Sequence, residues 1–183
     1  MTHPAPYILG IGGTTRAGSS SERILRAALA RIEARGMATQ CIAGPDLVLP
    51  IYDAADASRS QAATNLVSAM RGSAGIVIAS PGYHGTVSGL VKNALDYAED
   101  LANDPQPYFD GKPIGCIACA YGWQATSSTL TTLRTIAHAL RGWPTPLGIA
   151  VNSLTLASGA VDLPSDIVSC LDILSGHMVQ KHL

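Results

Sequence analysis

The chain has 183 residues, enough for one domain with a well-buried core. Hydrophobic residues make up 47% of it and charged residues 14%, which excludes a disordered chain. The formal net charge of −1 supplies no basic surface for nucleic acid, and no apolar run approaches the length of a membrane span. We expect one folded domain over residues 1–183 that binds neither nucleic acid nor a membrane.

The cysteines and the first residues bear on the cellular compartment. Four cysteines lie within apolar segments and lack the spacing of a small disulfide scaffold. Residues 1–6 carry no cationic region of a secretory leader. We therefore expect a cytoplasmic protein with reduced thiols. Low charge and high apolar content also favour a homo-oligomer, although an Ala-rich composition would explain the same hydropathy.

Strand and helix signals alternate along the chain. Short apolar runs bounded by Gly, Pro or Ser predict strands over residues 7–12, 39–43, 75–80, 114–120 and 145–151. Apolar residues at helical spacing predict helices over about 21–35, 61–71, 88–102, 127–140 and 164–179. Ser88 is the expected N-cap of the third helix.

Five strand–helix units predict an α/β fold, a three-layer sandwich in which a five-stranded parallel sheet carries helices on both faces. Five strands suit the flavodoxin-like order 2-1-3-4-5 better than a six-stranded Rossmann sheet. In that order the loops after the first, third and fourth strands share one crevice at the carboxyl edge. These are also the most polar and glycine-bearing loops of the chain.

The loop after the first strand has the composition of an anion site. Residues 13–21 read GTTRAGSSS and lead directly into a predicted helix. Hydroxyls, backbone amides and a helix N-terminus together bind phosphate, and Arg16 adds a planar positive charge. Helix capping alone would need only one of these hydroxyls. Because neither GK[ST] nor GxGxxG is present, a monophosphate is favoured over a triphosphate or a pyrophosphate.

The loops after the third and fourth strands add aromatic side chains to the same crevice. In the loop Pro81–Thr86, we expect backbone donors to face the polar edge of a bound planar ring, with Tyr83 along the ring and His84 at its border. The alternatives are a plain turn and a solvent-facing imidazole. Gly122 and Trp123, after the fourth strand, bring a second aromatic residue to the crevice.

Other sequence patterns indicate which chemistries are absent. Cys116 and Cys119 have Cys-x-x-Cys spacing, but within a strand they point to opposite faces, so we expect buried structural thiols. No His, Cys, Asp and Glu cluster has metal-ligand spacing, and no nucleophile elbow is present. We therefore expect no metal site and assign no catalytic acid, base or nucleophile.

Three segments resemble NAD(P)H-dependent FMN reductases. Residues 13–21 resemble the family's G-S-x-R-x-x-S-x-N loop, and residues 46–52, DLVLPIY, resemble its D-L-x-L-P-x-Y loop. Residues 80–97, SPGYHGTVSGLVKNALDY, are similar to its S-P-E-Y-N-(G/H)-(S/T)-x-P-G-x-L-K-N-A-x-D-W segment. The matching segments occur in the same order and span most of the chain.

The resemblance implies a flavodoxin-like fold that holds FMN, with NADPH or NADH as electron donor, usually as a homodimer or homotetramer. The implied phosphate ligands are Thr14, Arg16, Ser19 and Ser21. The implied contacts to the isoalloxazine ring and ribityl chain are Pro81, Gly82, Tyr83, His84, Gly85 and Thr86, to which the aromatic pattern adds Gly122 and Trp123. The helix carrying Lys92 and Asp96 often forms the subunit contact in such proteins, with that pair formed within or across subunits.

The chain departs from the family pattern beside the expected flavin ring. Gly82 replaces Glu, His84 replaces Asn, and Ser88 replaces Pro. The first two changes are expected to alter the flavin potential, the pocket size or the substrate.

The expected activity is that of an NAD(P)H-dependent FMN reductase. A hydride passes from the nicotinamide to N5 of the flavin and then to free flavin or another acceptor. One version releases reduced FMN to a flavin-dependent monooxygenase. The alternatives are an FMN-bound reductase of quinones, azo compounds or metal oxyanions, and a flavodoxin-type electron carrier without NAD(P)H turnover. Flavodoxins are typically strongly acidic, so the charge of −1 argues against the carrier.

Overall fold

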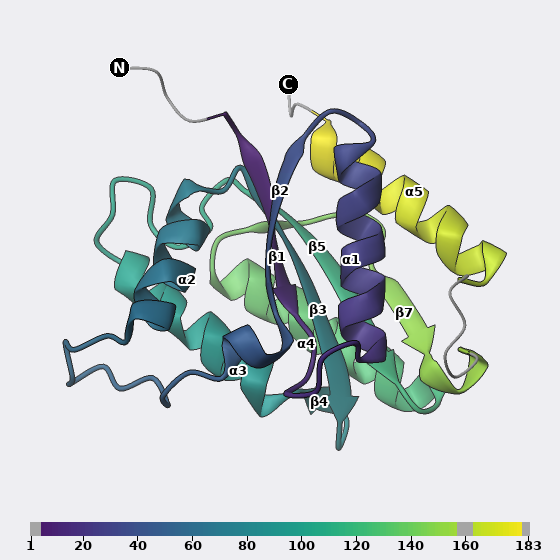
Figure 1. The fold of residues 1–183 in the computed structure, drawn as a ribbon, viewed down its shortest axis with the longest axis horizontal. Coiled ribbons are helices and arrows are strands. Elements are labelled where there is room, and N and C mark those ends of the chain that lie inside the picture. The colour runs from purple at the N-terminus through teal and green to yellow at the C-terminus, as the bar shows by residue number, and fades with distance from the viewer. Residues whose placement is uncertain (1–4, 157–162, 181–183) are drawn as a thin grey trace.

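The computed structural model describes residues 5–156 and 163–180. A mainly parallel sheet forms the central layer, and helices cover both of its faces (Figure 1). Its strands are β1 (Tyr7–Gly12), β2 (Ala38–Ala43), β3 (Gly75–Tyr83), β4 (Thr86–Val87), β5 (Pro113–Ala120), β6 (Trp143–Pro144) and β7 (Ile149–Asn152). The helices are α1 (Ser20–Glu33), α2 (Gln61–Gly72), α3 (Gly89–Asp96), α4 (Trp123–Ala139) and α5 (Ser165–Val179). Three short 3-10 helices are η1 (Gly44–Leu47), η2 (Tyr97–Leu101) and η3 (Ser153–Thr155).

The sheet order confirms the predicted topology. Strands follow one another as β2-β1-β3-β5, and both β6 and β7 pair in parallel with the outer edge of β5. This is the order 2-1-3-4-5, but the fifth position is shared by two short pieces: β7 overlaps the strand predicted over residues 145–151, and β6 lies just before it. Pro146, between those pieces, has no N–H to donate to a strand ladder.

Two apolar cores hold the three layers together. Helices α1 and α5 pack on one face of the sheet, and α2, α3 and α4 pack on the other (Figure 1). Cys116 belongs to the core beneath α2, α3 and α4, and Cys119 belongs to the core beneath α1 and α5, so the prediction that these thiols face opposite sides is confirmed. Burial raises the pKa of each thiol to about 12, which keeps both protonated.

Glycines bring strand β1 unusually close to its neighbours. A Cβ added at Gly12 would lie 2.2 Å from the carbonyl oxygen of Ala79 in β3, and one at Gly10 would lie 2.6 Å from Cδ1 of Leu29 in α1. The amide of Gly13 also donates to the Ala79 carbonyl at 3.2 Å. The carboxyl end of β1 is therefore held against the middle of β3, where the loop after β1 begins.

The segment after β3 is a hairpin, and the prediction of a loop over residues 81–86 is wrong in this respect. Strand β3 continues to Tyr83, and β4 returns antiparallel to it. The two turn residues, His84 and Gly85, have φ of 52° and 85°, the left-handed values of a type I′ turn. Thr129 in α4 donates its hydroxyl to the Thr86 carbonyl at 3.3 Å, which ties the hairpin to that helix.

Two helix boundaries also differ from the sequence prediction. Helix α4 begins at Trp123 rather than near residue 127, so Trp123 lies in a helical turn and not in a loop. The third helix is regular only to Asp96 and then tightens into η2. Its predicted cap is confirmed, because the Ser88 hydroxyl accepts from the Val91 amide. In the described part of the chain, no helix combines the length and apolarity needed to cross a membrane.

A buried lysine closes the end of helix α2. The Lys112 Nζ donates to the carbonyls of Met70 and Arg71 at 2.6 and 3.1 Å. These carbonyls lie in the last turn, where a helix has no internal donors for them. Burial, and then the nearby Arg71 charge, lower the pKa of Lys112 to about 8.

We expect Gly12→Ala to destabilise the fold by at least about 2 kcal/mol, because the new methyl meets rigid backbone and overpacking is costly. The matched control is Gly176→Ala in α5, where an added Cβ meets nothing within 4 Å. That change should be neutral or stabilise by about 0.5–1 kcal/mol, since Ala favours a helix more than Gly does. Urea unfolding of both variants measures the difference, and equal stability would contradict the close packing of β1 on β3.

We also expect the stability contribution of Lys112 to rise with pH. Its pKa of about 8 in the folded protein lies below the ordinary lysine value of 10.5, so the unfolded chain binds more protons between these values. The difference in unfolding free energy between the wild type and Lys112→Met should therefore grow from pH 7 to pH 10.

Candidate functional site

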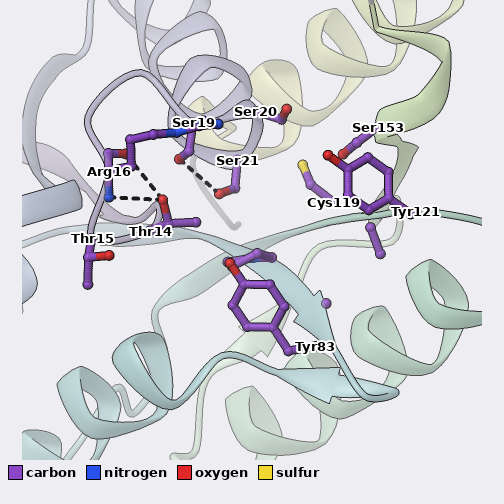
Figure 2. Close-up of a pocket in the computed structure, with 13 residues that line it drawn as sticks. Thr14, Thr15, Arg16, Ser19, Ser20, Ser21, Tyr83, Cys119, Tyr121 and Ser153 are labelled. Carbon is purple, nitrogen blue, oxygen red and sulfur yellow. Dashed lines mark hydrogen bonds between the residues drawn. The ribbon is translucent and has the colours of Figure 1, made fainter.

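A cavity of about 330 Å³ opens at the carboxyl edge of the sheet (Figure 2). The loops after β1, β3, β5 and β7 surround it, three of which were expected to share this crevice. It is lined by Thr14, Thr15, Arg16, Ser19, Ser20, Ser21, Pro81, Gly82, Tyr83, Cys119, Ala120, Tyr121 and Ser153.

One wall of the cavity is the start of helix α1. Ser19 is its N-cap, and the Ser19 hydroxyl accepts from the Glu22 amide at 3.4 Å and lies 3.4 Å from the Ser21 hydroxyl (Figure 2). The amides of Ser20 and Ser21 have no acceptor among the described residues, as is usual for the first turn of a helix. Hydroxyls, free amides and the positive end of the helix dipole therefore face one small volume.

The loop before this helix is shaped by Thr14. The Thr14 hydroxyl accepts from the Arg16 amide at 3.2 Å and donates to the Arg16 carbonyl at 3.1 Å (Figure 2). This hydroxyl is therefore already engaged within the loop. The exposed guanidinium of Arg16 makes no hydrogen bond or ion pair with the described residues, so its donors are available to an anion.

The opposite wall is aromatic and apolar. Tyr83, at the end of β3, is 52% exposed, and Tyr121, after β5, is 77% exposed. Figure 2 shows Tyr121 and Ser153 across the cavity from the serines of the first loop. The buried, protonated thiol of Cys119 adds an apolar surface beside them.

A second, more open cavity of about 610 Å³ adjoins the first, with Tyr121 in the wall of both. It is lined by Gly85, Tyr121, Gly122, Trp123, Gln124, Ala125 and Ser128. Helix α4 starts here without a side-chain cap, because its N-cap residue is Gly122 with φ of 93°.

The two cavities divide the residues expected from the sequence. Thr14, Arg16, Ser19, Ser21, Pro81, Gly82 and Tyr83 line the first, and Gly85, Gly122 and Trp123 line the second. His84 and Thr86 line neither, since His84 is at the exposed tip of the hairpin and Thr86 pairs with Tyr83 in the short ladder.

Sequence reasoning missed six residues of the first cavity. Thr15 and Ser20 belong to the same hydroxyl-rich run, so including the whole run would have found them. Cys119, Ala120 and Tyr121 end or follow β5 at the same sheet edge. Ser153 comes from η3 after β7, and no local signal marks it.

Close packing around position 82 explains why a glycine stands there. A Cβ there would lie 2.6 Å from Oγ1 of Thr129 and 2.9 Å from Cβ of Ala120. A glutamate, the residue at this position in the family pattern, would therefore require both the Thr129 side chain and Ala120 of β5 to shift. The departure at this position accompanies close contact between α4 and β3.

The donor set fits a phosphate monoester beside a planar ring. Hydroxyls, amides and a guanidinium suit the phosphate, and exposed aromatic faces suit the ring. The volume lies within the usual range for small-molecule sites, roughly 300–1,000 Å³. Within residues 5–156 and 163–180, no three His, Cys, Asp or Glu side chains are grouped to hold a metal ion.

Comparisons with known proteins identify the family of the chain. The family model of NADPH-dependent FMN reductases matches residues 6–154. An FMN-dependent NADPH-azoreductase of Staphylococcus aureus is 35% identical over 82 residues, which cover 45% of this chain and 40% of that protein. The chain thus aligns with less than half the length of this curated relative.

Solved structures of flavoenzymes share the fold. The apo form of an NADH:FMN oxidoreductase matches with a TM-score of 0.72 and 22% identity, covering 95% of this chain and 88% of that one. An NAD(P)H:(acceptor) oxidoreductase from Paracoccus denitrificans matches with a TM-score of 0.74 and 17% identity, covering 95% and 97%. These likenesses confirm the predicted flavodoxin-like fold.

The family match extends over most of the chain and includes all three segments on which the resemblance rested. The chain belongs to the NADPH-dependent FMN reductase family.

Proposed function

We propose that the protein is an NAD(P)H-dependent FMN oxidoreductase whose two adjoining cavities hold FMN. The observation that carries this proposal is the first cavity, where free first-turn amides, serine hydroxyls and the available Arg16 guanidinium face Tyr83. No other described part of the chain offers a comparable donor set for a phosphate monoester.

The phosphate end of FMN would contact Ser19, Ser21 and Arg16. Both serines are buried at the start of α1, and their hydroxyl protons can turn toward an anion. Thr14 would act on the phosphate indirectly, because its hydroxyl is already hydrogen-bonded to the Arg16 backbone. The phosphate thus meets a loop whose shape exists before binding.

The ring end would lie along the hairpin. Pro81, Gly82 and Tyr83 line the first cavity where β3 ends, and Gly85, Gly122 and Trp123 continue the wall into the second. The type I′ turn and the Thr129 hydroxyl hold this wall in place. His84 and Thr86 border the ring from the hairpin rather than lining its cavity.

FMN supplies the hydride chemistry when it is bound. The chain's own part is to bind and orient the flavin and to exclude water with Tyr83, Tyr121 and the apolar Cys119 surface. We assign no residue as catalytic acid, base or nucleophile. The electron donor is NADPH or NADH, and the final acceptor is free flavin passed to a monooxygenase, or a quinone, azo compound or metal oxyanion.

The exposed segment before α2 supports a homodimer or homotetramer built on α3. Asn93 of α3 holds this segment through hydrogen bonds to the Tyr52 amide and the Pro50 carbonyl. Next to these bonds, Ile51 is 83% exposed, which is unusual for so large an apolar side chain. Lys92 and Asp96 pair within their own helix. The free, unpaired thiols support a cytoplasmic location.

We expect Arg16→Ala to raise the dissociation constant for FMN at least about tenfold, the loss of one charge-assisted hydrogen bond. Riboflavin, which lacks the phosphate, should bind both proteins alike. The control is Arg71→Ala, which removes an exposed guanidinium paired with Asp104 outside both cavities. Flavin fluorescence titration measures the affinities of all three proteins for both flavins, and unchanged FMN binding by Arg16→Ala would refute the phosphate assignment.

We expect NADPH or NADH to bleach the visible absorbance of protein-bound FMN under anaerobic conditions. Free FMN with the same nucleotide serves as the control for uncatalysed reduction. If the bound flavin stays oxidised with both nucleotides, the protein is an electron carrier and not a reductase. Flavin that stays bound through gel filtration would favour direct reduction of an acceptor, whereas flavin that is lost would favour release of reduced FMN.

A further inference from the structure

A buried carboxylate lies directly under the first loop. Glu22, in the first turn of α1, is only 6% exposed. Its Oε2 accepts from the Gly18 amide at 2.9 Å, and its Oε1 accepts from Nε and Nη2 of Arg26 at 2.9 and 2.8 Å. Both oxygens are therefore engaged, one by the loop backbone and one by a neighbouring charge.

Glycines make room for this side chain. A Cβ at Gly13 would lie 3.3 Å from Cβ of Glu22, and one at Gly44 would lie 3.0 Å from Glu22 Oε2. Gly13, Gly18 and Gly44 all have positive φ, at 98°, 70° and 62°. The loop after β1 and the turn after β2 thus close around the carboxylate in conformations that favour glycine.

We propose that Glu22 is a positioning residue for the FMN phosphate. Its bond to the Gly18 amide sets the backbone immediately before the N-cap Ser19, and so sets where residues 14–18 lie above the helix. Because the Gly18 amide donates to Glu22, the amides that remain to bind the phosphate are those of Ser20 and Ser21. The inference rests on the proposed function, since it concerns the loop assigned there to the phosphate.

The charge of Glu22 alone would oppose a bound phosphate. A carboxylate near the start of a helix competes with any other anion for the positive end of the dipole. Arg26 forms an ion pair with Glu22 and compensates the charge of the carboxylate. The pair therefore opposes a bound phosphate less than the carboxylate alone would. The useful property of Glu22 is therefore its reach to Gly18 and not its negative charge.

An ordinary first-turn acid would behave differently. Such a residue stabilises a helix by its charge, points into solvent and can be replaced by aspartate. Aspartate at position 22 would keep the charge but would be shorter by about 1.5 Å, one carbon–carbon bond. It would not reach Gly18 and Arg26 together. Glutamine would keep the reach and lose the charge.

The test compares Glu22→Asp with Glu22→Gln. FMN and riboflavin affinities are measured by fluorescence titration, and exchange of the Gly18 amide hydrogen is followed by NMR. The matched control is Glu33→Asp, the same change at the exposed far end of α1. Riboflavin binding also reports whether each variant is folded.

We expect Glu22→Asp to weaken FMN binding roughly tenfold or more while riboflavin binding changes less than about twofold. The Gly18 amide should exchange faster in this variant. Glu22→Gln should bind FMN within about threefold of the wild type and keep the Gly18 amide protected. Glu33→Asp should change neither measurement.

The inference is overturned if Glu22→Asp binds FMN like the wild type, if it weakens FMN and riboflavin equally, or if Glu22→Gln is as impaired as Glu22→Asp. A wild-type protein that binds riboflavin as tightly as FMN would instead contradict the phosphate assignment itself. The two failures are therefore separate results of one set of titrations.

Discussion

The carbonyl oxygen of Ala79 lies where a side chain at position 12 would begin, and the arrangement of the site follows from this close approach. Gly12 and Ala79 are register partners at the carboxyl end of β1 and the middle of β3, and the Gly13 amide donates a hydrogen bond to the Ala79 carbonyl. Strand β1 ends at this point, whereas β3 continues to Tyr83. The loop after β1 therefore begins against the strand that leads into the hairpin, although 65 or more residues of chain separate the two segments.

From this junction, each loop gains its shape from a separate set of local bonds. Thr14 and Glu22 hold the first loop through backbone groups of Arg16 and Gly18. The hairpin is held by its own turn and by Thr129 of helix α4. A flavin that binds here therefore does not lose binding free energy to the ordering of these loops. A rigid site built from short loops is what the α/β sheet provides at its switch point.

Much of this could be predicted from the sequence, because the relevant signals are local. Short apolar runs gave the strands, and their number and alternation with helices indicated the sheet order. By composition alone, the run GTTRAGSSS marked a loop that lines the first cavity and to which we assign the phosphate. The resemblance of residues 80–97 to the family segment indicated FMN as the cofactor.

The remaining features depend on contacts between distant segments. The hairpin was missed because its turn uses His84 at positive φ, where Asn or Gly would have been the usual signal. The early start of α4 was missed because Gly122 offers no capping side chain. Ser153 reaches the cavity only through the pairing of β7 with β5. The bond from Glu22 to Gly18 needs the folded loop before it can be recognised.

The close packing around Gly82 also couples the residues allowed at neighbouring positions. Thr129 and Ala120 fill the space that a side chain at position 82 would occupy. A larger residue there requires both the Thr129 side chain and the Ala120 methyl to give way. Substitutions at positions 82, 120 and 129 are therefore expected to affect stability non-additively. A glutamate introduced at position 82 alone would not fit into this space.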